Sequence, residues 1–416
     1  ASGAPENGLL FSRHMGPGRH AVRVIVSAPG DSITFNDTVS RSFMVRFCNG
    51  SYTIAQEGGD YRSFGEAIDT LNIVGIQGPV QFYVEPGTYT EQVRLNNIPG
   101  SSDEHTIAFI GTGDNVLLTA ATTQNDNYVM LLDSTSHVTL SNFRIEARPA
   151  TGNFANALVV SKGDHITIDS LTVRVKGTIN NVNASCVVLM GEVSNLTFTN
   201  NVIDSGYYSF RHTGTVSNYE NFTLTGNTFK NFYSQGVYLR GVNNIVFNKN
   251  VVSSGVTIDN RALTGLYLAQ TAGTFSVQKN KIYLVDVKKG GKRGIQLENI
   301  GSTASNPGMV VNNMISCSGT GTAGLSPAKP SGIWIESSSA YVNIYYNTIR
   351  VYCGDVAAAF SESSYSFFSG PTVSHIQVSN NIFSNFSKGY AYYVSELNTL
   401  SISNYNAYYT TSTRPF

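Results

Sequence analysis

Two glutamates that hold the same place in a repeated short segment are the residues of this chain best suited to acid–base chemistry. The segments span 207–211, 236–240, 265–269, 294–298 and 332–336, and their fifth places are Arg211, Arg240, Ala269, Glu298 and Glu336. The second and fourth residues of each segment are apolar or aromatic, so in a strand the third and fifth side chains face solvent together. Neighbouring strands lie about 4.8 Å apart. The carboxyl groups of Glu298 and Glu336 are therefore expected to lie close together, as the two carboxyl groups of a retaining glycosidase do. This pattern predicts glycoside hydrolysis as one activity.

A second reaction fits the cations near these segments. β-Elimination on a uronate needs positive charge to neutralise the carboxylate and a Lys, Arg or His to take the neighbouring proton. The residues that offer these groups are Arg211, His212, Arg240, Lys288, Lys289, Lys292 and Arg293. The catalytic candidates are therefore Glu298, Glu336 and Arg240, although a basic loop is otherwise an ordinary solvated surface.

The third places of the same segments predict a surface that binds sugar. They are Ser209, Tyr238, Tyr267, Gln296 and Trp334, the last being the only tryptophan of the chain. Aromatic faces stack on pyranose rings, and arginine and carboxylate groups bind hydroxyls or uronates. We therefore predict glycan contacts by Tyr238, Tyr267, Gln296, Trp334, Arg211 and His212. The alternative is that these aromatic rings only pair with one another across neighbouring strands.

A degenerate nine-residue motif recurs through the back half of the chain and must position these segments. It has apolar residues at its second and fourth places, asparagine at its seventh and an aliphatic or aromatic residue at its ninth, as in NLTFTNNVI (195–203) and YVNIYYNTI (341–349). The asparagines recur every 23 to 34 residues, and they are Asn201, Asn227, Asn250, Asn280, Asn313, Asn347 and Asn381. The alternation has period two, so each motif is a strand, a two-residue corner and the start of another strand.

Short strands that repeat at a regular interval are typical of a solenoid, in which each repeat buries its face against its neighbours. The sequence therefore predicts an all-β, right-handed parallel β-helix of three sheets and about eleven coils, with the handedness following the crossover rule. Stacked asparagines can pass amide hydrogen bonds from coil to coil and satisfy buried corner backbone. Their amides also tolerate the left-handed geometry that corners need. This ladder is predicted at the corner between the second and third strands, away from the Tyr238 surface.

The first part of the chain lacks the motif. Residues 20–29 and 40–47 alternate as two strands about a turn, and the segment 1–48 resembles the closing strands of an immunoglobulin-like module of bacterial surface proteins. The β-helix is assigned to 49–416. Within it, Phe64, Ala67, Ile68 and Leu71 have the spacing of an amphipathic helix, which we expect to cap the open end of the solenoid.

The segments GGDYRSFGEAIDTL, FYVEPGTYTEQV (82–93) and IAFIGTG (107–113) resemble the opening of pectinesterases and of the wider pectin-lyase-like superfamily. The resemblance, over 58–111, implies a helical cap and first coils of a right-handed β-helix. It also implies a polysaccharide groove along the first sheet, flanked here by the loops 174–185, 253–264, 285–293 and 316–331. The catalytic signatures of pectinesterases, polygalacturonases and pectate lyases are missing, so pectin-specific catalysis is not implied.

No metal or cofactor is predicted. The four cysteines lack metal-binding spacing; Cys186 is expected to be a small buried residue, and a disulfide between Cys317 and Cys353 is a candidate. His137, His165 and His375 occupy the first place of the motif, where other coils have asparagine, so we interpret them as turn residues.

Composition narrows the function. The chain of 416 residues has zero formal net charge and 13% charged residues, which gives no electrostatic basis for binding nucleic acid. No apolar run is long enough for membrane insertion. We predict an extracellular or cell-surface module of a larger bacterial protein that binds polysaccharide or glycoconjugate, and that contacts other modules of the same polypeptide. The alternatives are a polysaccharide lyase or glycoside hydrolase and a structural spacer or assembly subunit.

Overall fold

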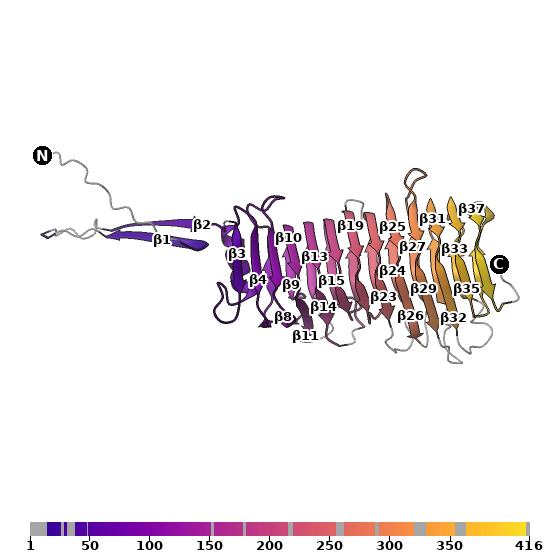
Figure 1. The fold of residues 1–416 in the computed structure, drawn as a ribbon, viewed down its shortest axis with the longest axis horizontal. Helices are drawn as coiled ribbons and strands as arrows, with labels where there is room; N and C mark the ends of the chain where they lie inside the picture. Colours follow the sequence, from indigo (N-terminus) through magenta and orange to yellow (C-terminus); the bar gives the residue numbers. More distant parts are fainter. Residues whose placement is uncertain are drawn as a thin grey trace.

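The chain folds as a right-handed parallel β-helix, as the sequence predicted. The structure is a computed structural model that describes residues 15–25, 29–30, 38–47, 49–150, 154–177, 180–214, 219–254, 262–287, 291–319, 330–353 and 363–412. In these ranges three parallel sheets of 11, 12 and 13 strands run the length of an elongated solenoid (Figure 1). These numbers confirm the predicted three-sheet architecture of about eleven coils.

A complete coil contributes one strand to each sheet, and we number the sheets by the order of their strands within a coil, starting from the short segment. The first sheet carries the short segments and contains β6 (Val93–Leu95), β9 (Met130–Asp133), β12 (Leu158–Ser161), β15 (Ser185–Met190), β18 (Tyr208–Thr213), β21 (Gln235–Arg240), β24 (Leu263–Ala269), β27 (Lys292–Glu298), β30 (Pro330–Glu336), β33 (Tyr365–Ser369) and β36 (Tyr390–Val394).

The second sheet is built from the first strand of each motif. It contains β3 (Gly50–Ile54), β4 (Val80–Val84), β7 (Ile107–Gly111), β10 (Ser136–Ser141), β13 (Asp164–Asp169), β16 (Ser194–Thr199), β19 (Tyr219–Thr225), β22 (Val242–Asn248), β25 (Phe275–Gln278), β28 (Gly308–Val311), β31 (Val342–Tyr345), β34 (Ile376–Ser379) and β37 (Leu400–Asn404), the last preceded by the 3₁₀ turn η2 (Leu397–Thr399).

The third sheet follows each ladder corner. It contains β5 (Gly87–Thr90), β8 (Val116–Thr122), β11 (Arg144–Pro149), β14 (Thr172–Val175), β17 (Val202–Asp204), β20 (Thr228–Lys230), β23 (Val251–Ser254), β26 (Lys281–Val287), β29 (Met314–Gly319), β32 (Thr348–Cys353), β35 (Ile382–Asn385) and β38 (Ala407–Thr410).

The asparagine ladder lies between the second and third sheets. All seven predicted members are buried, with at most 2% of their surface exposed. At a typical rung, Asn227 Oδ1 accepts from the backbone N–H and the side-chain amide of Asn201, and Asn227 Nδ2 donates to Phe198 O. An eighth rung, Asn406, closes the ladder by accepting from Asn381. The sequence motif missed Asn406 because an irregularity in the pairing of β34 with β37 shifts it by one place.

One detail of the ladder prediction was wrong. The left-handed backbone does not occur at the ladder asparagines but one residue earlier, at the sixth place. That place has φ between 55° and 73° at Asn200, Gly226, Lys249, Lys279, Asn312, Tyr346 and Asn380. The side chain at the sixth place of the motif takes no part in the ladder, so a residue as large as Tyr346 fits there. The side chain at the seventh place must be an amide that points inward.

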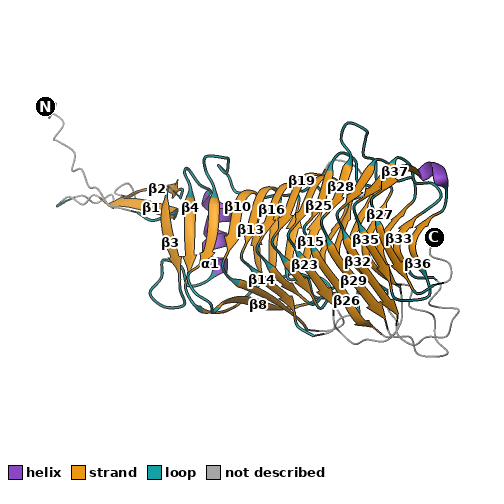
Figure 2. Ribbon diagram, turned by 45° about the vertical axis from the view of Figure 1, so that its right-hand side comes forward, coloured by secondary structure: helices purple, strands orange, loops and turns teal. Residues whose placement is uncertain are grey.

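Helix α1 (Phe64–Val74) packs over the N-terminal end of the solenoid, where it is visible beside β4 and β10 (Figure 2). Ser63 caps it by accepting from Glu66 N at 3.1 Å, and the Glu91 carboxylate accepts from Phe64 N and Gly65 N. The four residues whose spacing predicted the helix are at most 1% exposed. The Phe64 ring meets those of Tyr89, Phe109 and Phe143, so the helix covers the first coils as expected.

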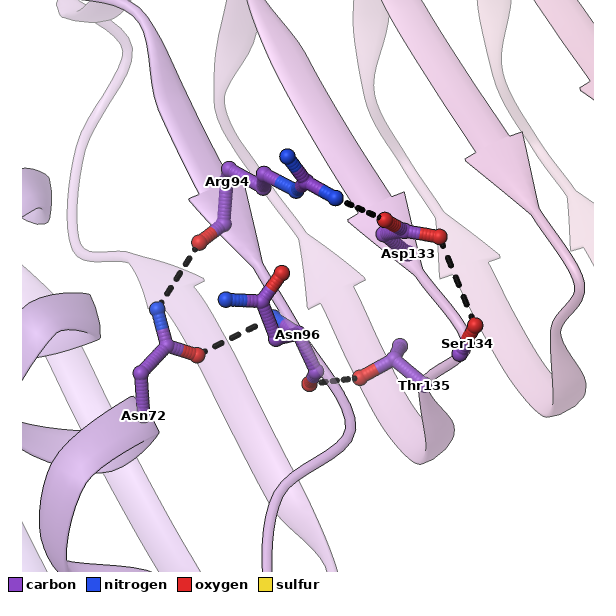
Figure 3. Close-up of polar contacts among 6 residues, drawn as sticks. All are labelled: Asn72, Arg94, Asn96, Asp133, Ser134 and Thr135. Atoms are coloured by element: carbon purple, nitrogen blue, oxygen red, sulfur yellow. Dashed lines mark hydrogen bonds and ion pairs between the residues drawn. The ribbon is translucent and has the colours of Figure 1, made fainter.

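Polar contacts also join the helix to the first sheet (Figure 3). Asn72 donates to Arg94 O and accepts from Asn96 N, and Asn96 O accepts from the Thr135 hydroxyl of the next coil. Arg94 pairs with Asp133 on the neighbouring strand. The first sheet therefore begins against the cap with its backbone groups already paired.

Ahead of the cap, β1 (Gly18–Ile25) and β2 (Thr38–Val45) form an antiparallel pair that extends away from the solenoid (Figure 1). The two strands overlap the predicted segments 20–29 and 40–47, and each begins two residues before its predicted start. Apolar side chains such as Val24 and Met44 are more than half exposed. Whether 1–48 belongs to an immunoglobulin-like module stays a prediction.

The candidate disulfide between Cys317 and Cys353, which the sequence left open, does not form. Cys317 is a free, buried thiol, and the register sets Val351 opposite it and Gly319 opposite Cys353. The two-residue offset separates the two positions along neighbouring strands. Cys186 is buried as expected, and its thiol donates to Asp204 O.

Candidate functional site

The first sheet presents one continuous row of outward side chains. Strand pairing sets them opposite one another without a break, and we call the outward row Leu131, Val159, Val188, Arg211, Tyr238, Tyr267, Gln296, Trp334, Phe368 and Tyr393. The predicted contacts Tyr238, Tyr267, Gln296 and Trp334 are thus neighbours, as expected. The row is longer than the sequence indicated at both ends.

The segment 207–211 differs from the prediction. Its register is displaced by two residues, so that Arg211 lies opposite Tyr238 and Thr213 lies opposite Arg240. A shift of two keeps outward residues outward, which is why alternation alone could not detect it. Ser209 and His212 are fully buried, so His212 does not belong to the outward row.

His212 belongs to the core. It lies opposite Leu239, packs against the rings of Tyr219 and Phe222, and its Nδ1–H donates to Arg240 O at 2.9 Å. Burial lowers the pKa of this imidazole to about 4. A neutral, enclosed histidine cannot serve as a cation for a uronate.

Both faces of the Trp334 ring are covered by its neighbours. The Arg293 guanidinium lies 4.2 Å from the centre of the Trp334 ring, and the Phe368 ring stacks on Trp334 with centres 3.7 Å apart. Tyr393 continues the stack, with its ring nearly parallel to Phe368. The alternative interpretation, rings that pair across strands, therefore describes Trp334. A ligand on this surface would meet ring edges rather than the Trp334 face.

Glu298 and Glu336 lie opposite each other on β27 and β30, as predicted. Each carboxylate already accepts hydrogen bonds within the row. Glu298 accepts from the Tyr267 hydroxyl, and Glu336 accepts from Gln296 Nε2 at 3.0 Å and from Arg293 Nη1 at 3.2 Å. Burial and the Glu298 hydrogen bond raise the pKa of Tyr267, so its proton stays on the phenol. Burial lowers the pKa of Arg293, and the attraction of Glu336 opposes that shift.

The predicted cations are dispersed. Arg240 Nε donates to Gln270 Oε1, and Arg211 Nη1 donates to Val182 O while its guanidinium lies over the Tyr208 ring. Lys292 is fully buried on β27 rather than solvated. Lys288 and Lys289 lie outside the described residues.

A groove lies on the first sheet at the N-terminal half of the row, beside the loop 174–185 that the family resemblance predicted to flank one. It encloses about 330 Å³, with Leu131, Val159 and Val188 among its lining residues and Arg211 at one end. Its wall carries Asn127, Asn156 and Asn183. The available signal was the Asn-Ala pair before an apolar run, which occurs at 156–157 and 183–184.

The histidines at the first motif place are corner residues. His137, His165 and His375 have φ between 50° and 56°, and Asn195 in the same column is also left-handed. Among the described residues, one group of three could hold a metal ion, namely Asp103, His137 and His165. The two imidazoles are stacked 4.9 Å apart at 13°. Their in-plane lone pairs run side by side and do not converge on one ion, so the structural interpretation stands.

Comparison with known proteins gives neighbours of the same fold only. No family model matches this chain, and no curated relative matches it. Among solved structures, a pectin methylesterase of Aspergillus niger matches 70% of this chain and 86% of its own length, with 14% identity and a TM-score of 0.33.

Two further structures show the same range of similarity. The Dettilon tailspike protein matches 83% of this chain and 64% of its own length, with 11% identity and a TM-score of 0.45. Pectin methylesterase PemA of Erwinia chrysanthemi matches 70% of this chain and 90% of its own, with 10% identity and a TM-score of 0.31. At these identities the likeness describes the fold, and the chain is similar to these proteins in its parallel β-helix alone.

Proposed function

We propose that this chain is a non-catalytic, extracellular binding module whose ligand is an elongated glycan lying along the first sheet. The observation that supports it is the unbroken register of the outward row from Leu131 to Tyr393. Because neighbouring strands are about 4.8 Å apart, the row presents one side chain about every 4.8 Å along a linear polymer that lies on it. No helix among the described residues has the length and apolar content needed to span a bilayer.

Polar edges supply the recognition in this proposal. The hydroxyl of Tyr238 makes no hydrogen bond to another described residue, and its ring packs 5.1 Å from that of Tyr267. The apolar body of the Tyr238 ring keeps water out of the row while its hydroxyl remains available. Sugar hydroxyls are both donors and acceptors, so they fit a row of phenols, a glutamine amide and carboxylates.

The hydrogen bonds of the two glutamates favour binding over catalysis. A carboxylate that accepts hydrogen bonds from its neighbours is suited to holding those side chains in one orientation. Glu298 and Glu336 are both engaged by neighbours in the row. We therefore assign them to the binding surface as acceptors that orient Tyr267, Gln296 and Arg293.

Polysaccharide retention tests the proposal. The protein is run on columns of uronate-containing and neutral polysaccharides, and the same mixtures are assayed for unsaturated products and new reducing ends. Tyr238→Ala should weaken retention of the bound polysaccharide about tenfold, the effect of losing one good hydrogen bond and its ring contact. Tyr283→Ala, a tyrosine on the third sheet, is the matched control and should bind as wild type does.

Two outcomes would overturn this assignment. Cleavage that Glu336→Gln abolishes would establish the lyase or hydrolase alternative. Neither retention nor cleavage across the panel would favour a spacer or assembly subunit.

A further inference from the structure

The groove at the N-terminal half of the outward row has an apolar floor. Leu131, Val159 and Val188 lie opposite one another on β9, β12 and β15. Although they point outward from the sheet, Val159 and Val188 are only 2% and 4% exposed. The neighbouring loops therefore fold over the sheet here and make a depression of about 330 Å³, which is within the range of small-ligand sites.

One wall of the groove is a short line of amides fixed by backbone hydrogen bonds. Asn127 Nδ2 donates to Asn183 O, Asn127 Oδ1 accepts from Asn156 N, and Asn156 Oδ1 accepts from Ser185 N. These bonds hold Asn127 and Asn156 in one orientation. Asn156 Nδ2 and the side-chain amide of Asn183 make no hydrogen bond to a described residue, and so they remain for a ligand.

Charge distinguishes this groove from the rest of the row. No carboxylate is among its described lining residues, and Arg211 stands at one end. Arg211 Nη1 is tied to Val182 O, but Arg211 Nε is buried and has no partner among the described residues. A buried donor without a partner is costly unless a ligand or water satisfies it.

We propose that the groove is a subsite for an N-acetylated sugar residue of an acidic glycan; this rests on the glycan-binding function proposed above. The acetamido methyl lies against Leu131 and Met190, two apolar lining residues that remain at least partly exposed, while the acetamido N–H and carbonyl pair with Asn183 and Asn156 Nδ2. A neighbouring carboxylate accepts from Arg211. A plain hydroxyl in place of the acetamido group would leave Leu131 and Met190 uncovered and the amides unpaired, which is the basis of the selectivity.

Three hexasaccharides separate the contributions. Hyaluronan hexasaccharide carries both acetamido groups and uronates, chitohexaose carries acetamido groups alone, and hexagalacturonate carries uronates alone. We expect the hyaluronan fragment to bind at least tenfold more tightly than hexagalacturonate by calorimetry. In saturation-transfer NMR, its acetamido methyl should receive the strongest saturation.

The variants are chosen to leave the fold intact. Asn183→Ala removes an exposed side chain without a hydrogen bond and should weaken hyaluronan fragment binding about tenfold, with no effect on hexagalacturonate. Arg211→Met should weaken the two acidic ligands and leave chitohexaose unchanged. Asn343→Ala on the second sheet is the control and should leave all three affinities as in wild type.

The two proposals fail differently. Equal binding of all three ligands, or binding of hexagalacturonate alone, would overturn the acetamido subsite and leave the glycan-binding function intact. Binding of none of the three, while the polysaccharide columns retain the protein through Tyr238, would also refute this subsite. If the Tyr238 variant is retained as wild type is, the glycan surface itself is misassigned.

Discussion

Removal of one interior rung of the asparagine ladder should destabilise the fold far more than removal of the rung at its open end. Asn250 is fully buried. Its Oδ1 accepts from Asn227 N at 2.9 Å and its Nδ2 donates to Leu224 O at 2.9 Å. Asn250→Ala deprives both backbone groups of these partners. Leaving a buried donor or acceptor unsatisfied costs about 1–3 kcal/mol each, so we expect a loss of about 2–6 kcal/mol in the free energy of unfolding.

The eighth rung supplies a control of the same chemistry. Asn406 makes the same kinds of bond to Asn381 N and to Val378 O. It is only half-buried at the open end of the ladder, where water can replace the lost amide. Asn406→Ala should therefore cost about 1 kcal/mol or less.

Guanidinium denaturation followed by far-UV circular dichroism gives the two free energies. Hydrogen exchange at the Asn227 amide gives a local measurement that does not depend on two-state unfolding, which solenoids need not obey. Equal losses for Asn250→Ala and Asn406→Ala, or unchanged protection of the Asn227 amide, would refute the reasoning that the ladder satisfies buried backbone.

Three further predictions concern other parts of the fold. Because burial lowers the pKa of His212 to about 4, the unfolded chain takes up its proton first as the pH falls. Stability present above about pH 6.5 should be lost towards pH 4 by about 3 kcal/mol, and pH-dependent denaturation of His212→Leu should lack that slope. Cys317, whose pKa burial raises to about 12, should resist a thiol reagent in the native protein and react after unfolding without reductant; a disulfide-linked Cys317 peptide would contradict this. Phe64→Ala should cost about 3–5 kcal/mol by opening a cavity beneath the cap, and Ser63→Ala only about 1 kcal/mol, so thermal melts that rank them in the opposite order would show that the helix does not seal the first coils.

The local features of the fold were predictable because they depend on few residues. The alternation of apolar and polar residues predicts whether each side chain faces the inside or the outside of a coil. The asparagine recurs at the same place in many coils, so the strands, the corners and the ladder could all be predicted. The capping helix was predicted for the same reason, since its apolar residues lie on one turn-by-turn stripe from Phe64 to Leu71. Glu298 and Glu336 were placed together correctly because their coils have matching short strands.

The errors came from features that alternation does not encode. The two-residue displacement of 207–211 preserves which side chains face outward, so it moved Arg211 to a different column unnoticed. His212 was wrongly predicted to lie on the surface. It directly follows the segment 207–211, whose end was predicted by analogy with the other coils. The Cys317–Cys353 pairing, which the sequence left open, is excluded by a two-residue offset of the same kind.

The sequence by itself determined the solenoid, its ladder corner and the sheet on which an outward row would stand, because each depends on a short period repeated along the chain. Tertiary structure decided what that row can offer a ligand. Only stacked coils bring Arg293 and Phe368 onto the two faces of Trp334, and engage both glutamates with neighbours. Only the meeting of loops from three coils closes a groove over Val159 and Val188. These contacts join residues about one coil apart in the chain. The short period of the strand pattern does not determine how side chains of neighbouring coils meet.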